Sequence, residues 1–311
     1  MTAETFSLVS SKGGARLECR ALAELPWLVH AFGTRQGGAL KPEKSAKSAG
    51  NGFAGHAPGG FLRALGAGRF PLAALRQTHS SIIYSVARRS GRGPLLYQLA
   101  GNPLPGSQDA PGTRPGDALM TEQAGILLSV RVADCVPILL ADREGRVVAA
   151  VHAGWRGALS RIIEKSAGEM CRTFGSRPQN LVAAVGPSIR ACCYEVGPEV
   201  LDAFCGTFPA GEQFFHKVLA TPEESRMALR FETLFRLQAP PGHRAEDALS
   251  KIHLDLAAVA RYQLEHAGVP SGQIHVADYC TACRTDLFYS YRKEGSLAGR
   301  MMAVIGMRPL K

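Results

Sequence analysis

Three residues that could bind one metal ion are widely separated in the chain: His79, Cys135 and His152. His152 follows the apolar run VVAAV (147–151) and precedes a glycine-rich turn, Ala-Gly-Trp-Arg-Gly. Cys135 directly precedes the apolar run VPILL, and His79 lies in the strand-like segment LRQTHSSIIY (75–84). Two imidazoles and one thiol arriving from three strands suggest a three-ligand metal site with one open position.

Zinc suits this set of ligands, because it accepts imidazole nitrogen and thiolate sulfur. A zinc-bound water has a pKa lowered to about 7, which provides a hydroxide nucleophile near neutral pH. Sequence separation neither supports nor excludes the site, since catalytic ligands often come from different strands. A structural alternative stays open for two of the residues: Cys135 could be an inert core thiol, and His79 could form hydrogen bonds in the core.

The turn after His152 has features of a ligand-binding loop. Its glycines let the backbone approach a ligand closely, and a helix that begins there would offer N–H donors to an anion. Arg156 adds a fork of donors that fits phosphate or carboxylate. Trp155 is expected to pack in the core and not to stack on a base.

Length and composition indicate a globular protein that can bury a substantial hydrophobic core. The chain has 311 residues, of which 46% are hydrophobic and 20% charged. No run approaches the roughly 18 apolar residues of a membrane span, and the N-terminus lacks the pattern of a secretory signal. The eight cysteines show no regular spacing, which favours a reduced, cytoplasmic compartment over a disulfide framework.

The formal charge of +10 is concentrated in the N-terminal third, where residues 30–108 contain ten Lys or Arg and one acid, Glu43. Such a region could bind phosphate-bearing ligands or nucleic acid, or it could be a solvated basic face. Aromatic residues are sparse there, so single-stranded nucleic acid is not an expected ligand.

Short apolar runs from Asp117 onward predict strands buried on both faces: ILLSVR, PILLAD, VVAAV, LVAAVG, IHVA and MMAVIG. Helical periodicity predicts helices over 158–174 and 252–267. Strands and helices do not alternate strictly, which favours the α+β class with mixed β-sheets flanked by helices. We expect one domain over residues 1–311, with a flexible, Gly/Pro-rich loop at 90–116.

Several long motifs resemble the laccase-domain family, also known as the multicopper polyphenol oxidase-like or peptidoglycan editing factor family. They are, in chain order, FGTRQGG (32–38), RQTHS (76–80), DALMT (117–121), ADCVPILLAD (133–142), VHAGWRGAL (151–159), GPSIRACCYEVG (186–197), CTACRTDLFYSYRKEG (280–295) and GRMMAVIGM (299–307). The resemblance extends over nearly the whole chain.

The resemblance implies a single α+β domain of the cytotoxic necrotizing factor-like architecture. It also implies a zinc ion bound by His79, Cys135 and His152, which would then be the catalytic residues. Similar proteins are purine nucleoside phosphorylases that convert adenosine, inosine, guanosine and methylthioadenosine, with phosphate, to the base and ribose 1-phosphate. They also deaminate adenosine to inosine. The expected partners are therefore purine nucleosides and phosphate, with no membrane or nucleic acid, and we expect a monomer.

Charge and motif membership select three candidates for binding phosphate or ribose: Arg35, Arg156 and Arg292. One segment departs from the family pattern, which usually carries Asn-Leu-Gly and His-x-Gly-Asp motifs ahead of the first metal histidine. Here residues 48–68 are degenerate and glycine-rich. Substrate preference is in question if that segment shapes the nucleoside site.

Three other functions remain open from the sequence. A copper polyphenol oxidase would need a trinuclear cluster, and the nine histidines contain no His-x-His pair, so copper is the less favoured metal. A cysteine hydrolase or peptidoglycan editing amidase could use Cys135 as a nucleophile activated by His152. A non-enzymatic binder could use the basic third, but it would leave the three metal-binding residues unexplained.

Overall fold

The computed structural model describes residues 5–40, 59–89, 92–100, 114–219 and 250–309. The chain divides into two compact units. The first unit contains residues 1–189 and 256–311, and the second contains residues 190–255. The expectation of one domain over residues 1–311 stays a prediction.

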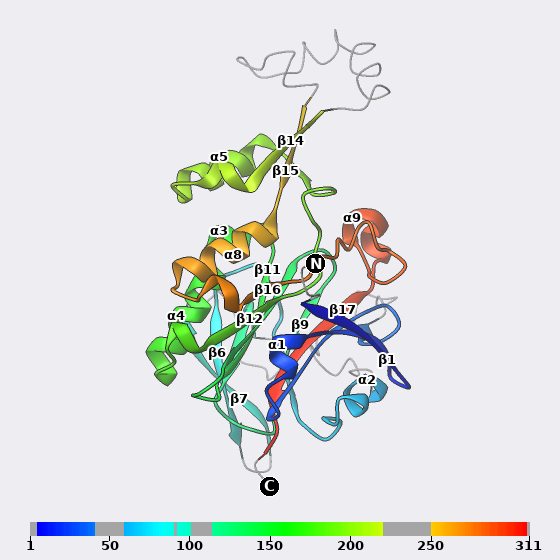
Figure 1. The fold of residues 1–311 in the computed structure, drawn as a ribbon, viewed down its shortest axis with the longest axis vertical. Coiled ribbons are helices and arrows are strands. Elements are labelled where there is room, and N and C mark those ends of the chain that lie inside the picture. Colours follow the sequence, from blue (N-terminus) through cyan, green and yellow to red (C-terminus); the bar gives the residue numbers. More distant parts are fainter. Residues whose placement is uncertain (1–4, 41–58, 90–91, 101–113, 220–249, 310–311) are drawn as a thin grey trace. The chain divides into compact units, whose positions relative to one another are not determined.

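Two mixed β-sheets form the first unit (Figure 1). The first sheet has the order β1 (Phe6–Ser11), β2 (Gly14–Cys19), β3 (Leu28–Gly33), β17 (Arg300–Met307), β9 (Leu127–Val132) and β5 (Leu72–Ala73), with β4 (Ala39–Leu40) also paired to β17. The second has the order β16 (Ile274–Val276), β12 (Leu181–Val185), β10 (Val136–Asp142), β11 (Val148–Ala153), β8 (Ala118–Thr121), β6 (Ile83–Arg89) and β7 (Arg92–Ala100). Both contain parallel and antiparallel pairs, which confirms the α+β class with mixed sheets.

The main hydrophobic core lies between the two sheets. Along β17, Met301, Ala303 and Ile305 belong to this core, together with Leu139 of β10 and Val148 of β11. The alternate β17 residues, such as Met302 and Val304, instead pack against Phe61 of α2 (Gly59–Ala64). Because β17 is covered on both faces, it is continuously apolar from Met301 to Met307 and does not alternate between apolar and polar residues.

Helices cover the outer face of the second sheet, where α4 (Ile162–Phe174) and α8 (Leu256–His266) run along its strands in Figure 1. The predicted helix over 158–174 begins earlier, as α3 (Trp155–Leu159), and is interrupted before α4 by Arg161, whose φ is +60°. Buried Gln263 of α8 supports this break by donating to the Ala158 carbonyl at 2.6 Å. The helix predicted over 252–267 starts only at Leu256, because residue 252 belongs to β15 (Ser250–Leu254).

The segment 90–116, predicted as a loop, contains a strand. β7 occupies Arg92–Ala100 and pairs antiparallel with β6. Residues 90–91 and 101–113 lie outside the described residues, as does 48–58 of the glycine-rich segment. The loop prediction was wrong for β7 because Gly and Pro dominate its flanks, and because an edge strand tolerates proline.

The second unit is small. In its described part, a three-stranded sheet has the order β13 (Glu195–Val196), β15 and β14 (Phe215–Leu219), and α5 (Pro198–Thr207) precedes β14 in the chain. Aromatic rings of Phe204, Phe208 and Phe214 pack against one another with centroids 5.6–6.4 Å apart. Among the described residues, the other short helices are α1 (Arg20–Ala23), α9 (Tyr291–Glu294), and the 3₁₀ turns η1 (Pro178–Asn180), η2 (Gly211–Phe214), η4 (Ser271–Gln273) and η5 (Gly295–Leu297).

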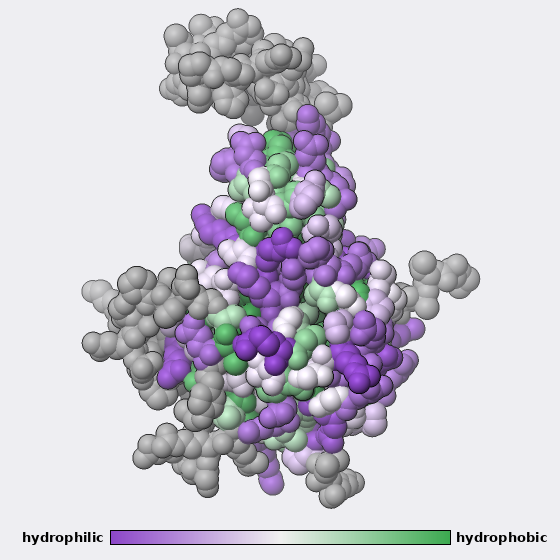
Figure 2. Space-filling model, turned by 90° about the vertical axis from the view of Figure 1, so that its left-hand side faces the viewer, coloured by the Kyte–Doolittle hydropathy of each residue, from purple (hydrophilic) through white to green (hydrophobic). Residues whose placement is uncertain are grey.

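The surface mixes polar and apolar side chains, as the face drawn in Figure 2 shows. Four large hydrophobic residues are exposed among those described: Leu8, Val218, Tyr291 and Leu297. In the described part of the chain, no helix has both the length and the apolar character needed to cross a membrane.

Candidate metal centre

The structure brings together the three residues predicted to bind metal. The ligand atoms of His79, Cys135 and His152 all lie within 4.8 Å of one another. Cys135 Sγ is 3.6 Å from His79 Nε2, and the two imidazole rings meet edge-on with centroids 5.0 Å apart. Zinc bonds of about 2.3 Å to sulfur and 2.0 Å to nitrogen, at a tetrahedral angle, would place those two atoms about 3.5 Å apart. The donor set and its spacing therefore fit a zinc ion.

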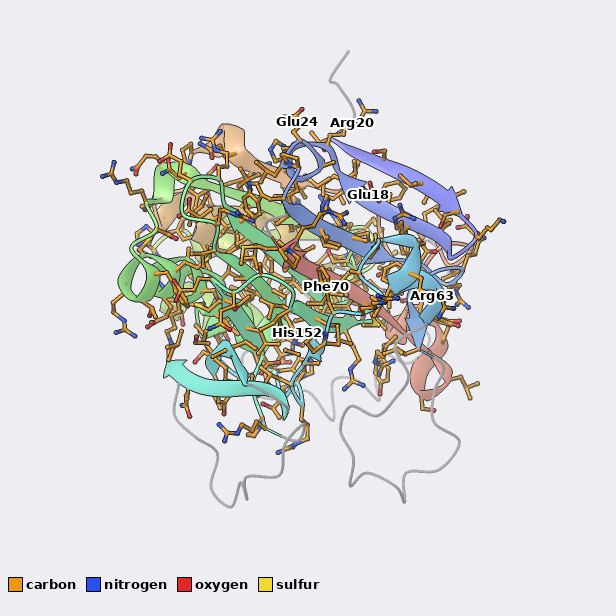
Figure 3. All side chains as sticks on the ribbon, turned by 90° about the horizontal axis from the view of Figure 1, so that it is seen from below. Glu18, Arg20, Glu24, Arg63, Phe70 and His152 are labelled. Carbon is orange, nitrogen blue, oxygen red and sulfur yellow. The ribbon has the colours of Figure 1, made fainter. Side chains whose placement is uncertain are left out.

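Sheet topology explains why these distant residues meet. β8 lies between β6 and β11 in the second sheet, and β10 lies on the other side of β11. His152 is in β11 opposite Pro137 of β10, so Cys135 just before β10 lies near it. His79 precedes β6, which pairs in parallel with the start of β8. Figure 3 labels His152 among the strands of this sheet.

The sequence suggested a strand at His79, but the structure places this residue in the turn before β6. Its φ is +59°, in the left-handed region that non-glycine residues seldom adopt. Gln77 ties this turn to the first sheet, because its side chain donates to the Arg131 carbonyl at 2.7 Å and accepts from the Arg131 N–H at 2.8 Å. His79, a proposed metal ligand with a left-handed backbone, therefore lies in a turn that the first sheet holds in place.

Asp117 is a fully buried carboxylate next to two of the three ligands. Its Oδ1 accepts from the backbone N–H of His79 at 3.0 Å and lies 2.8 Å from His152 Nδ1. Its Oδ2 accepts from the backbone and the hydroxyl of Ser80 at 2.7 and 2.6 Å. Sequence reasoning included Asp117 only as part of a family motif and gave it no role. The available signal was an acidic residue immediately before the strand Ala118–Thr121.

A second buried aspartate, Asp134, shapes the turn that carries Cys135. Its φ is +88°. Its carboxylate accepts from the Thr281 hydroxyl at 2.6 Å and from the backbone N–H of Arg292 at 2.7 Å. Its own carbonyl accepts from the Ile189 N–H at 2.9 Å. The C-terminal segment therefore holds the position of the thiol indirectly.

Gly154 allows the close approach of the ligands. A Cβ at this position would lie 2.6 Å from His79 Cδ2 and 3.1 Å from Cys135 Sγ. Real Cβ atoms essentially never come within 3.0 Å of another heavy atom in this way. The glycine after the strand β11 is therefore required by the packing of the site, which gives a structural reason for part of the glycine-rich turn.

Cys135 and His152 change each other's protonation. Burial raises the pKa of the Cys135 thiol, but the charge of His152 and hydrogen bonds from both histidines outweigh this and lower that pKa to about 6. Burial lowers the pKa of His152, yet Cys135 and Asp117 together raise it to about 9. Without metal, each group therefore favours the charged form of the other, a thiolate beside an imidazolium.

The three predicted phosphate-binding arginines have different surroundings. The Arg35 side chain donates to the Phe288 carbonyl at 2.8 Å, pairs with Glu294 and lies 4.1 Å over the Tyr289 ring. Arg156 is exposed and stacks on half-buried Trp155 at 4.3 Å. The side chain of Arg292 is exposed, while its backbone contacts Asp134.

Comparisons with known proteins agree on the family. Residues 59–308 match the family model described as multi-copper polyphenol oxidoreductase laccase. Purine nucleoside phosphorylase YlmD of Geobacillus stearothermophilus is 36% identical over 208 residues, which cover 65% of this chain and 64% of that protein. Adenosine deaminase RL5, from an unknown prokaryotic organism, is 37% identical over 184 residues, 59% of each chain.

The matched part of the chain thus spans less than two thirds of either relative. The crystal structure of YlmD from Geobacillus stearothermophilus superposes with a TM-score of 0.70 at 26% identity, covering 98% of this chain and 100% of that one. Since the family model matches most of the sequence and a solved relative has the same fold, this chain belongs to the family described as multi-copper polyphenol oxidoreductase laccase.

Proposed function

We propose that this protein is a zinc-dependent purine nucleoside phosphorylase with adenosine deaminase activity. The convergence of His79, Cys135 and His152 within 4.8 Å carries the proposal, because it supplies a catalytic-type ligand set. Relatives named purine nucleoside phosphorylase and adenosine deaminase support an enzyme of this kind. The substrates we propose are adenosine, inosine, guanosine and methylthioadenosine.

His79, Cys135 and His152 would hold the ion. His152 would bind through Nε2, since its Nδ1 lies 2.8 Å from the Asp117 carboxylate. When bound, zinc supplies Lewis-acid chemistry and lowers the pKa of water at its open position to about 7. The protein's part is to keep the thiolate and both imidazoles in place, and the low pKa of Cys135 favours the form of the thiol that binds metal.

Each proposed reaction exchanges one bond at the purine nucleoside. In phosphorolysis, a phosphate oxygen bonds to the anomeric carbon as the glycosidic bond breaks, and the departing base takes up a proton. In deamination, water adds at C6 of adenine and ammonia leaves. Both reactions place an oxygen nucleophile against an electron-poor carbon, so one site can serve both.

Phosphate is proposed to bind near Arg35, Arg156 and Arg292, and their contacts rank them. The guanidinium of Arg35 already contacts Glu294 and Tyr289, so it would have to give up those contacts to bind phosphate. Arg156 lies in α3, shortly after His152 in the chain. It is exposed, with its guanidinium stacked on Trp155. We therefore place Arg156 first among the three.

A cysteine hydrolase is the second candidate, and one observation favours it. Cys135, whose pKa is lowered to about 6, lies beside His152, which Asp117 orients in turn. This is the arrangement of a nucleophile, a base and an orienting carboxylate. The same atoms serve both proposals, but a thiolate bound to zinc is not a free nucleophile. Copper oxidation is less favoured, because the described residues bring two imidazoles to this site, too few for a trinuclear copper cluster.

The deciding experiment measures the metal content of the purified protein together with its products from adenosine and phosphate. We expect about one zinc per chain, as in three-ligand catalytic sites, and the appearance of adenine, ribose 1-phosphate and inosine. Full phosphorolysis by a zinc-free Cys135→Ala protein would overturn the mechanism. Protein without metal whose Cys135 alkylates rapidly would favour the hydrolase. A cytoplasmic monomer, expected from the sequence, stays a prediction.

A further inference from the structure

The carboxylate of Asp117 contacts the segments that contain His79 and His152, the two imidazole ligands. We propose that Asp117 is a positioning residue that holds His79 and His152 in the metal-binding arrangement at the same time. The inference rests on the metal centre of the proposed function but not on its substrate. It assigns a role to a residue that sequence reasoning left without one.

The position of Asp117 follows from strand order. It directly precedes β8, which lies between β6 and β11 in the second sheet. Ala118 pairs with Val151 on one side and with Ile83 on the other. The residue before Ala118 therefore lies between the end of β11, which carries His152, and the turn before β6, which carries His79.

Asp117 stabilises the left-handed turn at His79. It accepts hydrogen bonds from three successive backbone N–H groups, those of Thr78, His79 and Ser80, at 3.2, 3.0 and 2.7 Å. The Ser80 hydroxyl adds a fourth bond at 2.6 Å. A non-glycine residue in a sparsely populated backbone region is unfavourable and persists only when its surroundings hold it there. The carboxylate provides that support.

Asp117 also fixes which nitrogen of His152 faces the metal position. Oδ1 lies 2.8 Å from His152 Nδ1, and the Asp117 carbonyl accepts from the His152 N–H at 2.8 Å. An ionised carboxylate can only accept hydrogen bonds, so Nδ1 must carry the hydrogen. Nε2 is then the nitrogen that binds a metal ion, once the ion has displaced any proton there.

An asparagine at position 117 has the same shape but cannot satisfy both sides. Oδ1 and Oδ2 each face donors, from His152 and His79 on one side and from Ser80 on the other. The amide NH₂ of asparagine, itself a donor, must therefore face the donors on one of these two sides. Facing His152, it would move the imidazole hydrogen to Nε2 and block coordination; facing Ser80, it would release the turn that carries His79.

Asp142 provides a matched control. It is another buried aspartate, and its Oδ1 accepts from the backbone N–H groups of Glu144 and Gly145 at 3.0 and 2.9 Å. It closes the turn at the far end of the β10–β11 hairpin, away from the Pro137–His152 pair. Asp142→Asn makes the same chemical change in a similar environment without touching a ligand.

The test measures zinc affinity by competition with a chromophoric chelator for the wild type, Asp117→Asn and Asp142→Asn. Circular dichroism and thermal unfolding of each protein report whether it is folded. We expect Asp117→Asn to lose about 10- to 100-fold in zinc affinity, as is typical when the partner of a metal-binding histidine is removed. Asp142→Asn should bind zinc as the wild type does, whatever its loss of stability. A folded Asp117→Asn protein with wild-type affinity would overturn the inference.

A second measurement covers the case in which Asp117→Asn does not fold. In zinc-loaded wild-type protein labelled with ¹⁵N-histidine, NMR should show His152 with a protonated Nδ1 and a metal-bound Nε2. The opposite arrangement would overturn the inference, even with zinc bound and the enzyme active. A wild-type protein that binds no zinc would instead overturn the metal centre of the proposed function, and this inference with it.

Discussion

Cys135 Sγ lies 3.6 Å from His79 Nε2, although 56 residues of chain separate them. The distance is close to the roughly 3.5 Å expected for two donors on one zinc ion. Two left-handed residues lie at these positions, His79 itself and Asp134 beside Cys135. Both are held by hydrogen bonds that buried carboxylates accept: Asp117 from the His79 N–H, and Asp134 from the Thr281 hydroxyl. The protein therefore stores backbone strain where it holds the proposed metal ligands, as functional sites commonly do.

Replacing any one of the three ligands should remove both activities together. We expect His79→Ala, Cys135→Ala and His152→Ala to lose zinc, phosphorolysis and deamination while keeping the circular dichroism spectrum of the wild type. The matched control is Cys205→Ala, which removes an exposed thiol from the second unit. It should retain metal and activity. A ligand variant that loses one activity and keeps the other would contradict a shared centre.

Adding one methyl group at Gly154 should damage the metal site. The new Cβ of Gly154→Ala would lie 2.6 Å from His79 Cδ2 and 3.1 Å from Cys135 Sγ, so the His79 ring must shift from its present position. We expect weaker zinc binding and lower activity in both assays. Gly168→Ala is the control, because it lies in α4 with nothing within 4 Å of the added Cβ. Helix propensity should make that variant more stable by about 0.5–1 kcal/mol, with unchanged zinc affinity.

Zinc affinity should fall as the pH is lowered. His152 has a pKa of about 9 without metal, so below that pH zinc must displace its proton. One displaced proton corresponds to about a tenfold loss of affinity per pH unit. Below a pH of about 6 the Cys135 thiol is protonated as well, and the dependence should steepen. Chelator competition between pH 6 and 9 measures the slope; a flat profile would contradict the thiolate–imidazolium pair.

Arg156→Ala should weaken phosphate use without affecting the metal. Its guanidinium is exposed and has no contact with the ligands among the interactions described for it, so zinc content should stay at the wild-type level. We expect the KM for phosphate to rise while adenosine deamination, which uses no phosphate, is retained. Arg177→Ala, at another exposed arginine, is the control. Equal loss of both activities would indicate that Arg156 acts on something other than phosphate.

Arg35→Ala should reduce stability more than Arg156→Ala does. Its side chain joins the Phe288 carbonyl, Glu294 and the Tyr289 ring, which ties residues 32–38 to the C-terminal segment. Loss of these contacts should lower the free energy of unfolding by about 1–3 kcal/mol, the usual cost of leaving hydrogen-bonded groups unpaired. Thermal or urea unfolding measures it. If the Arg35→Ala protein kept wild-type stability but had a raised KM for phosphate, Arg35 would be a phosphate-binding residue and not a structural one.

Local patterns were sufficient for much of the fold. PILLA and VVAAV are continuously apolar because β10 and β11 are buried on both faces, so each could be predicted as a strand from its own residues. The helix predicted over 158–174 ends at Phe174, and Gly175 follows it with a φ of +72°. The candidate metal-binding residues were also recognisable, because Cys135 and His152 adjoin apolar runs and His79 lies in a strand-like segment.

Other features depend on partners distant in sequence and have no local signal. The break at Arg161 is supported by Gln263 of α8, and the strand β7 is defined by its pairing with β6. In the same way, Asp117 looks like one more acidic residue until strand order places it between His79 and His152. Residue types and apolar runs thus specified which strands form and which atoms could bind metal. Their meeting point, its support by a buried carboxylate and the left-handed turns arise only when the sheets pair, because those hydrogen bonds join segments that are remote along the chain.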